Sequence, residues 1–299
     1  MHAGGARHSA DMDLGLVVRP ELPPEDLLRH VRAAEAAGFA EAWLWEDCFK
    51  GGGIAQVATA LAATERITVG LGIMPAPVRN AAFTAMETAL LARLHPGRFH
   101  AGLGHGVAEW MRQIGARPKS SMTMLEETTV AVRALLRGES VDAEGRYVRL
   151  RGVALDHPPA RVPPVSLGVV GPKGLELSGR VADGTVLDWL SSPGYVRHAR
   201  ERIDAGRAAA GRTDPHRLTV FLIAAGDEAT VRREVDARRA AGGEQERFMD
   251  GPLEDLAVMP GTERATLRAL AEAGADCVAL VSPDPEVPLD AAALAAALA

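Results

Sequence analysis

A Gly-Pro-Lys-Gly turn at residues 171–174 lies between a short apolar strand and an amphipathic helix, and it is the segment best suited to bind an anion. The strand is expected at 165–170, Pro172 suits the first position of the helix, and Lys173 adds a positive charge. Backbone N–H groups at a helix N-terminus lack partners within the helix, so they bind phosphate readily. The turn therefore predicts a phosphate site, and a tight turn that holds nothing is the alternative.

Two other apolar strands end in residues that can contact a ligand. Glu46 and Asp47 close one of them, and because neighbouring side chains of a strand point to opposite faces, we expect one acid to hydrogen-bond a ligand. The alternative is that one acid caps the following turn while the other faces solvent. Gly72 before the β-branched Ile73 can form a bulge or a strained peptide under a flat ligand, and an ordinary strand-end glycine is the alternative.

Glycines occupy every second position at the end of a further strand. Gly102, Gly104 and Gly106 leave one face of this strand without side chains, so its backbone can approach a ligand closely. His105 between them can donate a hydrogen bond or transfer a proton, and a purely structural histidine is the alternative. Trp110, in the loop that follows, can reach the same space.

These strands belong to a chain in which strand and helix patterns alternate. Apolar runs and helical faces predict eight strands with helices between them, including a helix at 125–136 after the fourth strand. Eight such units indicate a closed (β/α)8 barrel, whereas an open dinucleotide-binding sheet has about six strands. The predicted fold class is therefore α/β, a TIM barrel, with ligand-binding residues at the C-terminal ends of its strands. The strands are expected at 14–18, 42–45, 67–73, 98–103, 165–170, 185–187, 218–224 and 277–281.

The chain fits one domain with a single interruption. Within residues 138–164, apolar and polar residues alternate in RYVRL, and the segment DHPPARVPP cannot be helical. We interpret 138–164 as an insertion between the fourth helix and the fifth strand. We expect residues 1–11 to form a disordered extension, with Met12 as an alternative start, and residues 12–299 to form the single domain.

Composition excludes several classes of protein. The net charge is −6 and the arginines are interspersed with acidic residues, which argues against a nucleic-acid surface. Cys48 and Cys277 lie far apart and form no CxxC pair, so neither a disulfide framework nor a structural zinc site is expected. No apolar run reaches the roughly 18 residues of a membrane helix, and the N-terminus lacks the apolar core of a secretion signal. The sequence predicts a cytoplasmic protein that binds neither nucleic acid nor membrane.

The residues at the predicted strand ends also limit the chemistry. They contain no His-x-His motif and no cluster of histidine and carboxylate for the ions of a barrel hydrolase, so we expect no metal. There is no GxSxG motif, and Cys48 has no histidine on its own strand end. Hydrolysis by a metal or by a covalent nucleophile is therefore not expected.

Three segments carry a resemblance to a known family. They are WLWEDCF at 43–49, ITVGLGIMPAPVRNAAFTAMETALLARLHPGRFHAGLGHG at 67–106, and VVGPKGLELSGRVADGTVL at 169–187. Together they resemble the bacterial luciferase-like family of flavin- or deazaflavin-dependent oxidoreductases, over most of the chain from Leu14 to Val281. The resemblance implies a (β/α)8 barrel with an insertion between the fourth strand's helix and the fifth strand, which matches residues 138–164.

The resemblance also implies where a cofactor lies. Its ring would rest over the strand ends, against a bulge with a non-proline cis peptide at Gly72–Ile73. The backbone at 104–106 and 171–174 would line the cofactor, and 171–174 would lie near its ribityl phosphate, in agreement with the helix-terminus argument. The segment GPKGLELSGRVADG resembles the branch that uses the deazaflavin F420, with FMN as the alternative. The residues expected to contact the cofactor are Glu46, Gly72, Ile73, Gly104, Gly106, Val170, Gly171, Pro172, Lys173 and Gly174.

The chain departs from the sugar-phosphate dehydrogenases of this family. They carry an Asp-His pair after the second strand and a Glu after the fourth-strand glycines, where this chain has Asp47-Cys48 and Val107. Sugar oxidation is therefore in doubt, and Asp47 and His105 remain as candidate catalytic groups. The resemblance implies a homodimeric oxidoreductase that transfers a hydride between F420 or FMN and a small organic substrate. An FMN-dependent two-component monooxygenase that uses oxygen, and a barrel that binds the cofactor without turnover, are the alternatives.

Overall fold

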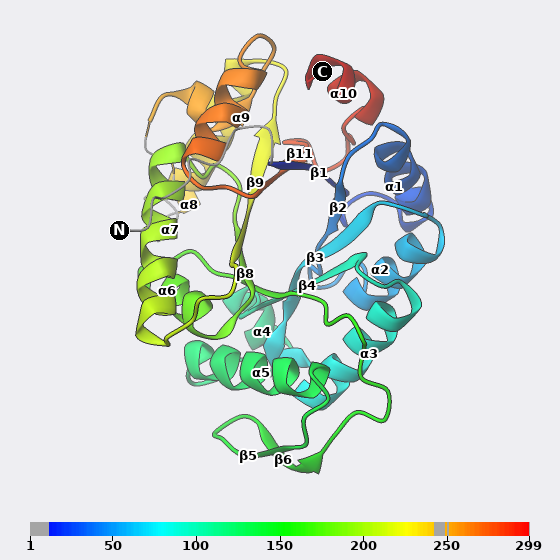
Figure 1. Ribbon diagram of the computed structural model, residues 1–299. Coiled ribbons are helices and arrows are strands. Elements are labelled where there is room, and N and C mark those ends of the chain that lie inside the picture. Colours follow the sequence, from blue (N-terminus) through cyan, green and yellow to red (C-terminus); the bar gives the residue numbers. More distant parts are fainter. Residues whose placement is uncertain (1–11, 242–248, 250, 299) are drawn as a thin grey trace.

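The computed structural model describes residues 12–241, 249 and 251–298, and a closed barrel of eight parallel strands forms its centre (Figure 1). The predicted TIM barrel is confirmed, because β11 pairs with β1 and β8 pairs with β9 to complete the ring. The two-residue strand β10 (Ala257–Val258) adds a short pairing to β9. In order round the ring, the strands are β1 (Asp13–Val17), β2 (Glu41–Leu44), β3 (Thr68–Pro75), β4 (Phe99–Gly104), β7 (Val165–Gly168), β8 (Gly184–Leu187), β9 (Arg217–Ala224) and β11 (Cys277–Val281).

Helices surround the barrel, and several begin or end at residues suited to capping (Figure 1). The Asn80 side chain accepts a hydrogen bond from the Ala82 N–H (2.9 Å) where α3 begins. Gly38 follows α1 with a φ of +87°, a conformation that glycine adopts without strain. The helices are α1 (Leu27–Ala36), α2 (Gly53–Ala62), α3 (Ala81–Leu94), α4 (Ala108–Gln113), α5 (Ser121–Leu136), α6 (Pro172–Val181), α7 (Pro193–Ala209), α8 (Glu228–Ala241), α9 (Glu263–Glu272) and α10 (Ala291–Leu298).

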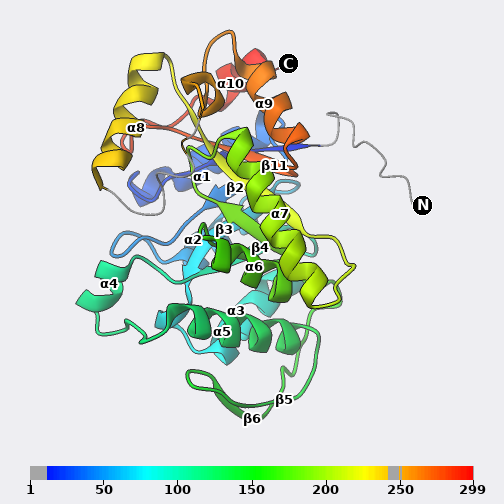
Figure 2. The ribbon, with the colours of Figure 1, turned by 90° about the vertical axis from the view of Figure 1, so that its left-hand side faces the viewer.

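The predicted elements differ from the structure mainly at their ends. The helix expected at 125–136 begins four residues earlier, at Ser121, because the Ser120 side chain caps it by accepting a hydrogen bond from the Thr123 N–H. The strand expected at 165–170 ends at Gly168. Sequence reasoning missed α4, a single short helix that projects from the ring of helices (Figure 2). The extension predicted at residues 1–11 lies outside the described residues.

The insertion predicted at 138–164 contains a hairpin that packs against α5. Its strands β5 (Val141–Glu144) and β6 (Arg149–Val153) pair antiparallel, and both views place the hairpin beside α5 at the outer edge of the molecule (Figures 1 and 2). The Glu127 carboxylate of α5 accepts hydrogen bonds of 2.7 to 2.9 Å from the backbone N–H groups of residues 146–148. These bonds fix the hairpin to the helix layer, outside the barrel.

Buried charges lie where the barrel strands begin. Glu41 is 3% exposed, and its carboxylate accepts hydrogen bonds from Trp43 Nε1 (2.7 Å) and from Arg217 Nη2 (2.6 Å). Arg217 also donates to Asp13 (2.6 Å). Burying a charge is costly unless it is paired and hydrogen-bonded, and these bonds satisfy the Glu41 carboxylate at the N-terminal end of the barrel.

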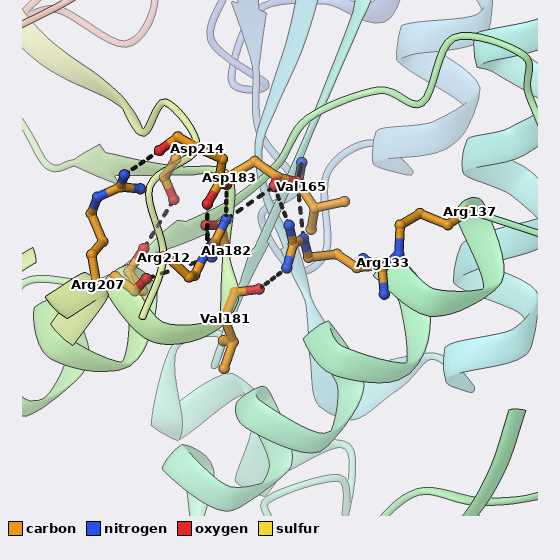
Figure 3. Close-up of polar contacts among 12 residues, drawn as sticks. Arg133, Arg137, Val165, Val181, Ala182, Asp183, Arg207, Arg212 and Asp214 are labelled. Carbon is orange, nitrogen blue, oxygen red and sulfur yellow. Dashed lines mark hydrogen bonds and ion pairs between the residues drawn. The ribbon is translucent and has the colours of Figure 1, made fainter. Parts of the chain in front are cut away.

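A second ion-pair cluster joins helices to the strand starts (Figure 3). The Asp183 carboxylate, just before β8, accepts hydrogen bonds from Arg133 Nε of α5 (3.0 Å) and from the Val165 N–H at the start of β7 (3.0 Å). Arg212 lies 3.5 Å from Asp183 and also pairs with Asp214. The cluster anchors α5 to two neighbouring strands and leaves the opposite strand ends available for a site.

Candidate active site

A cavity of about 580 Å³ opens at the C-terminal ends of the barrel strands. Residues at or just beyond the ends of β1, β2, β3, β7 and β8, together with the loop after β4, line it. Two residues from α4 and one residue each from β9 and α8 complete the lining. TIM-barrel enzymes place their active sites at this end of the barrel, and pockets for small molecules span about 300 to 1,000 Å³. The cavity therefore has the position and size of an active site.

Strand β3 carries a bulge at the cavity. Its pairing with β4 shifts register between Leu71 and Met74, so Gly72 and Ile73 lie in an irregular segment. The Gly72–Ile73 peptide is cis, as predicted, and both residues line the cavity. A second cis peptide, Cys48–Phe49, was not predicted.

The Ile73 side chain lies against Gly104 of β4 and Gly168 of β7, which corrects the prediction that the strand face at Gly104 is free to receive a ligand. A Cβ on Gly104 would lie 2.7 Å from Ile73 Cδ1, and a Cβ on Gly168 would lie 2.5 Å from Ile73 Cγ2. A Cβ on Gly102 would lie 2.3 Å from the Leu71 carbonyl oxygen. The bulge fills this groove from inside the protein, and of the predicted pair Gly104 and Gly106 only Gly106 lines the cavity.

The two adjacent acids after β2 have different surroundings. The Glu46 carboxylate accepts hydrogen bonds from the Gly53 N–H (3.1 Å) and from Arg79 Nη1 (3.0 Å), so it caps α2 and holds the loop, although it also lines the cavity. The Asp47 carboxylate accepts a hydrogen bond from Trp45 Nε1 (3.1 Å) and lies 3.8 Å from Lys50 Nζ. Burial raises the pKa of Asp47, and the Trp45 hydrogen bond and the Lys50 charge offset this only in part.

His105 and Gly106 form the turn beyond β4. His105 is exposed and lines the cavity, with Nδ1 at 2.8 Å from the Gly106 carbonyl oxygen. Gly106 has a φ of +70°, which a side chain would oppose. The turn leads into α4, which supplies Trp110 to the same cavity, as predicted from sequence.

The predicted phosphate turn begins α6, at the edge of the cavity. Gly171 is the residue before the helix, with no side-chain cap, and Pro172 occupies its first position. Lys173 is exposed, whereas a Cβ on Gly174 would lie 3.0 Å from Val169 Cβ, so Gly174 serves close packing of the helix on the loop that follows β7. Of the predicted residues 170–174, Val170 lines the cavity.

Aromatic residues and arginines to which sequence reasoning had assigned no role form one side of the cavity, although Arg19 and Trp189 lie in the strand-end ranges 18–20 and 188–192 where ligand-binding residues were expected. Trp189 follows β8, with the guanidinium carbons of Arg19 and Arg238 at 4.9 and 4.7 Å from its ring centroid. Trp45 meets Trp189 edge to face, at 6.1 Å between centroids, and Phe221 at 6.0 Å. Arg19 and Trp189 lie just beyond strand ends, where active-site residues of a TIM barrel are expected. Their residue types alone did not indicate a role in catalysis or binding.

Arg19 joins several loops at the cavity mouth. It donates hydrogen bonds to the Ser282 carbonyl oxygen (2.9 Å) and to both carboxylate oxygens of Glu21. Glu21 also pairs with Lys50 at 2.7 Å. Burial opposes ionisation of Glu21, but the hydrogen bonds from Arg19 and Lys50 outweigh it and lower the pKa of this carboxyl. These ion pairs and the hydrogen bond to Ser282 thus connect the loops after β1, β2 and β11.

The described part of the chain offers no group of three or more His, Cys, Asp and Glu side chains placed to hold a metal ion. Within the same residues, no helix has the length and apolar character needed to cross a membrane.

Comparison with known proteins places this geometry in a family. The sequence model of the luciferase-like monooxygenases matches residues 5–280. The chain is 31% identical over 214 residues to the 5,10-methylenetetrahydromethanopterin reductase of Methanolobus tindarius, which covers 71% of this chain and 64% of that protein. It is 31% identical over 255 residues to the F420-dependent hydroxymycolic acid dehydrogenase of Mycobacterium tuberculosis, covering 78% and 69%. The chain spans less than two thirds of the first relative's length.

A solved structure agrees with the fold. The F420-dependent secondary alcohol dehydrogenase in complex with an F420–acetone adduct superposes with a TM-score of 0.80 at 20% identity, over 96% of this chain and 98% of the other. At this identity the likeness supports the barrel architecture.

Proposed function

Because the chain belongs to the luciferase-like monooxygenase family, we propose that it is an oxidoreductase that uses F420, or alternatively FMN, to transfer a hydride to or from a small organic substrate. The observation that carries this proposal is the cavity at the strand ends, where the bulged backbone of Gly72 and Ile73 forms part of the wall. Both curated relatives described above are reductases or dehydrogenases, and one is named for F420.

The cavity fits a flat ring. The Ile73 side chain lies in the groove over Gly104 and Gly168, so it packs along the cavity wall at the bulge. The adjoining lining at Gly168, Val169 and Val170 is small or aliphatic, which suits an apolar ring face. Flavin-like cofactors supply the redox chemistry, and the protein supplies binding, orientation and exclusion of water.

The proposed roles follow from position. Gly72, Ile73, Gly106 and Val170 would contact the ring from the backbone side. The N–H groups at the start of α6, with Pro172 at its first position, would bind the phosphate, and Lys173 would add charge. We assign Gly171 and Gly174 to this segment as well, with Gly174 acting through packing. Glu46 and Gly104 would act indirectly, Glu46 through Arg79 and Gly104 through Ile73.

Asp47 and His105 are the proposed catalytic residues. Asp47 lines the cavity with a raised pKa, so its protonated form persists to higher pH and can supply a proton when a hydride is transferred. His105 lies at the mouth and can exchange protons with solvent. Hydride transfer to a carbonyl carbon requires one proton on the carbonyl oxygen, and these side chains are placed to provide it.

A two-component monooxygenase that receives reduced FMN and uses oxygen is the second candidate, favoured by the name of the family that matches the chain. One experiment separates the two candidates. Purified protein is titrated with F420 and with FMN while cofactor fluorescence is followed, and oxygen consumption is then recorded with each reduced cofactor. We expect F420 to bind more tightly and oxygen use to be low. Tenfold tighter FMN binding, about 1.4 kcal/mol, would reverse the ranking, and binding of neither at millimolar concentration would reject the proposal.

We also propose that the protein is a homodimer in a reducing cytoplasm. Helix α3 exposes Phe83, Met86, Leu90 and Leu94 along one face, each at least 50% exposed. An apolar helix face of this kind is expected to be covered, and two copies related by a twofold axis can cover it mutually. The free thiols Cys48 and Cys277 support the proposed compartment.

A further inference from the structure

We infer that the cavity takes an uncharged, planar and unsaturated substrate, which lies against an aromatic wall formed by Trp45, Trp189 and Phe221. This inference rests on the proposed function, because it assigns the bulge side of the cavity to the cofactor and the aromatic side to the substrate. Two observations carry it, the placement of the wall and the charge of the lining.

Two of the three residues of the aromatic wall, Trp189 and Phe221, come from the side of the barrel away from the bulge, whereas Trp45 follows β2, the neighbour of β3. In the closed ring, β9 with Phe221 lies four strands from β3 in either direction, and Trp45 and Trp189 follow β2 and β8. The Phe221 ring reaches inward, since a Cβ on Gly72 would lie 3.0 Å from its Cζ. Phe221 therefore forms a floor that extends from the wall to the bulge.

Ring contacts join the three aromatic residues of the wall. Trp45 and Trp189 are nearly perpendicular at 86°, and Trp45 and Phe221 are tilted by 31°. Arg19 and Arg238 both lie over the Trp189 ring. Aromatic pairs gain from stacked or edge-to-face contacts beyond simple burial of area. A planar unsaturated ligand can add such contacts to the wall, and a saturated ligand of the same carbon skeleton cannot.

The lining disfavours an anion. Both of its guanidinium groups are paired within the protein, Arg19 with Glu21 at 3.2 Å and Arg238 with Asp188 at 2.9 Å. The four carboxylates of the lining are paired with cations as well, so among the described residues the lining offers no unpaired cation to a substrate carboxylate or phosphate. The carboxylates are Glu21, Glu46, Asp47 and Asp188.

The test compares three ketones that differ in one property each. Acetophenone is planar and neutral, cyclohexyl methyl ketone has the same carbon skeleton but is saturated, and 4-acetylbenzoate is planar but anionic. Their dissociation constants for the whole protein are measured by calorimetry up to millimolar concentration. We expect acetophenone to bind at least about fivefold more tightly than either of the others. Equal binding of acetophenone and cyclohexyl methyl ketone, tighter binding of 4-acetylbenzoate, or no binding of any of the three would overturn the inference.

Variants locate the preference on the wall. Trp189→Leu should reduce the preference for acetophenone over cyclohexyl methyl ketone to less than about twofold, and Trp45→Leu provides the same test if Trp189→Leu does not fold. Phe83→Leu removes an exposed aromatic ring of α3 and should keep the full preference. A preference that survives in both tryptophan variants would show that the wall does not select the ligand.

The two proposals fail in different ways. If neither F420 nor FMN binds but the ketone preference is observed, the proposed function is wrong and the aromatic wall still selects planar ligands. If a cofactor binds and the ketone preference is missing, this inference alone is wrong. Repeating the ketone titration with the bound cofactor present checks that both ligands share the cavity.

Discussion

Burial raises the pKa of Asp47, and three neighbours act against that rise, the indole N–H of Trp45 and the positive charges of Lys50 and Arg19. The same desolvation acts on His216, far from the cavity, where it lowers the pKa because the protonated form carries the charge. At the residue scale, one physical cause thus favours the neutral form of an acid in the cavity and of a base in the core.

Lys50→Met should raise the pKa of Asp47 further, because it removes a positive charge 3.8 Å from the carboxylate. The measurement is a pH titration of the carboxyl carbons by NMR on aspartate-labelled protein, with Asp47→Asn to assign the signal. Asp156→Asn, at an exposed position of the insertion, is the control and should leave the signal in place. An Asp47 signal that titrates at the ordinary aspartate value would contradict the raised pKa.

His216 should make the protein sensitive to acid. Burial first, and then the charges of Arg200 and other arginines, lower its pKa from 6.5 to about 3. The unfolded chain binds a proton on this residue below pH 6.5, whereas the folded chain binds it only near pH 3. The stability that depends on neutral His216 is therefore complete above pH 6.5 and is lost as the pH falls toward 3, by at most about 1.4 kcal/mol per pH unit.

Urea unfolding at pH 7 and pH 5 tests this expectation. His216→Gln should be less stable at pH 7, because the hydrogen bond of His216 Nε2 with Thr185 (2.8 Å) is altered, but its stability should change less between the two pH values. His157→Gln, at an exposed position, should follow the unmodified protein. The same pH slope in His216→Gln as in the unmodified protein would rule out His216 as the cause.

At the scale of elements, the β3 bulge and the β4 glycines form one unit. The bulge turns Ile73 toward β4 and β7, and the absence of side chains at Gly104 and Gly168 provides the space. The start of α6 is a second such unit, in which Gly174 allows the helix to approach Val169 of the preceding loop closely. Both units place backbone at the cavity by means of glycine.

Gly104→Ala should destabilise the protein by about 1 to 3 kcal/mol, because its Cβ overlaps the far end of the Ile73 side chain. Adding Ile73→Ala should relieve that overlap, so the double variant should show an interaction energy that opposes the Gly104→Ala loss. Gly102→Ala meets the Leu71 carbonyl oxygen, so Ile73→Ala should not rescue it. Urea unfolding of the unmodified protein, the three single variants and the two double variants decides this, and rescue at both positions would disprove the assignment.

Lys173→Ala should weaken cofactor binding only about two- to threefold, because one exposed charge is screened by salt and the backbone donors of α6 remain. Gly171→Val should weaken it more, because a branched side chain would occupy the place where a phosphate approaches. Gly171 has a φ of −80°, so valine is compatible with its backbone conformation and folding should persist. Fluorescence titration measures both affinities. Normal cofactor binding by a folded Gly171→Val protein would mean that the phosphate lies elsewhere.

At the scale of the whole molecule, the ion pairs of the strand starts and the cavity lie at opposite ends of the barrel. Buried ion pairs such as Glu41 with Arg217 join the strand starts, and the cavity occupies the strand ends. The apolar face of α3 lies on the outer layer, and its exposed side chains are the proposed contact between two copies.

Leu90→Asp should convert the proposed dimer to a monomer, because it places a charge in the middle of an apolar contact, at a cost of several kcal/mol when left unpaired. Light scattering after size-exclusion chromatography should show the molar mass falling by half at micromolar concentration. Val287→Asp, at an equally exposed position outside α3, should leave the mass unchanged. A monomeric unmodified protein would refute the proposed dimer directly.

Much of the fold and the position of the site could be predicted from the sequence. Strand and helix periodicity are local properties, so the order of elements, the barrel and the insertion followed from it. The start of α6 at a proline and the β3 bulge at a glycine could also be predicted, because the backbone preferences of these residues are local properties. The strand-end rule then pointed to Glu46, Asp47 and His105.

The contacts that give these residues their roles were decided only by the tertiary structure. Ile73 fills the groove that the glycine spacing alone assigned to a ligand, and Glu46 is paired with Arg79, 33 positions away. The Trp189 ring of the aromatic wall is covered by Arg19. The Arg19 guanidinium donates a hydrogen bond to Ser282 in the loop after β11, 263 positions away. Such contacts depend on which distant strand ends the closed barrel brings together, and no local pattern in the sequence indicates which strand ends lie close in space.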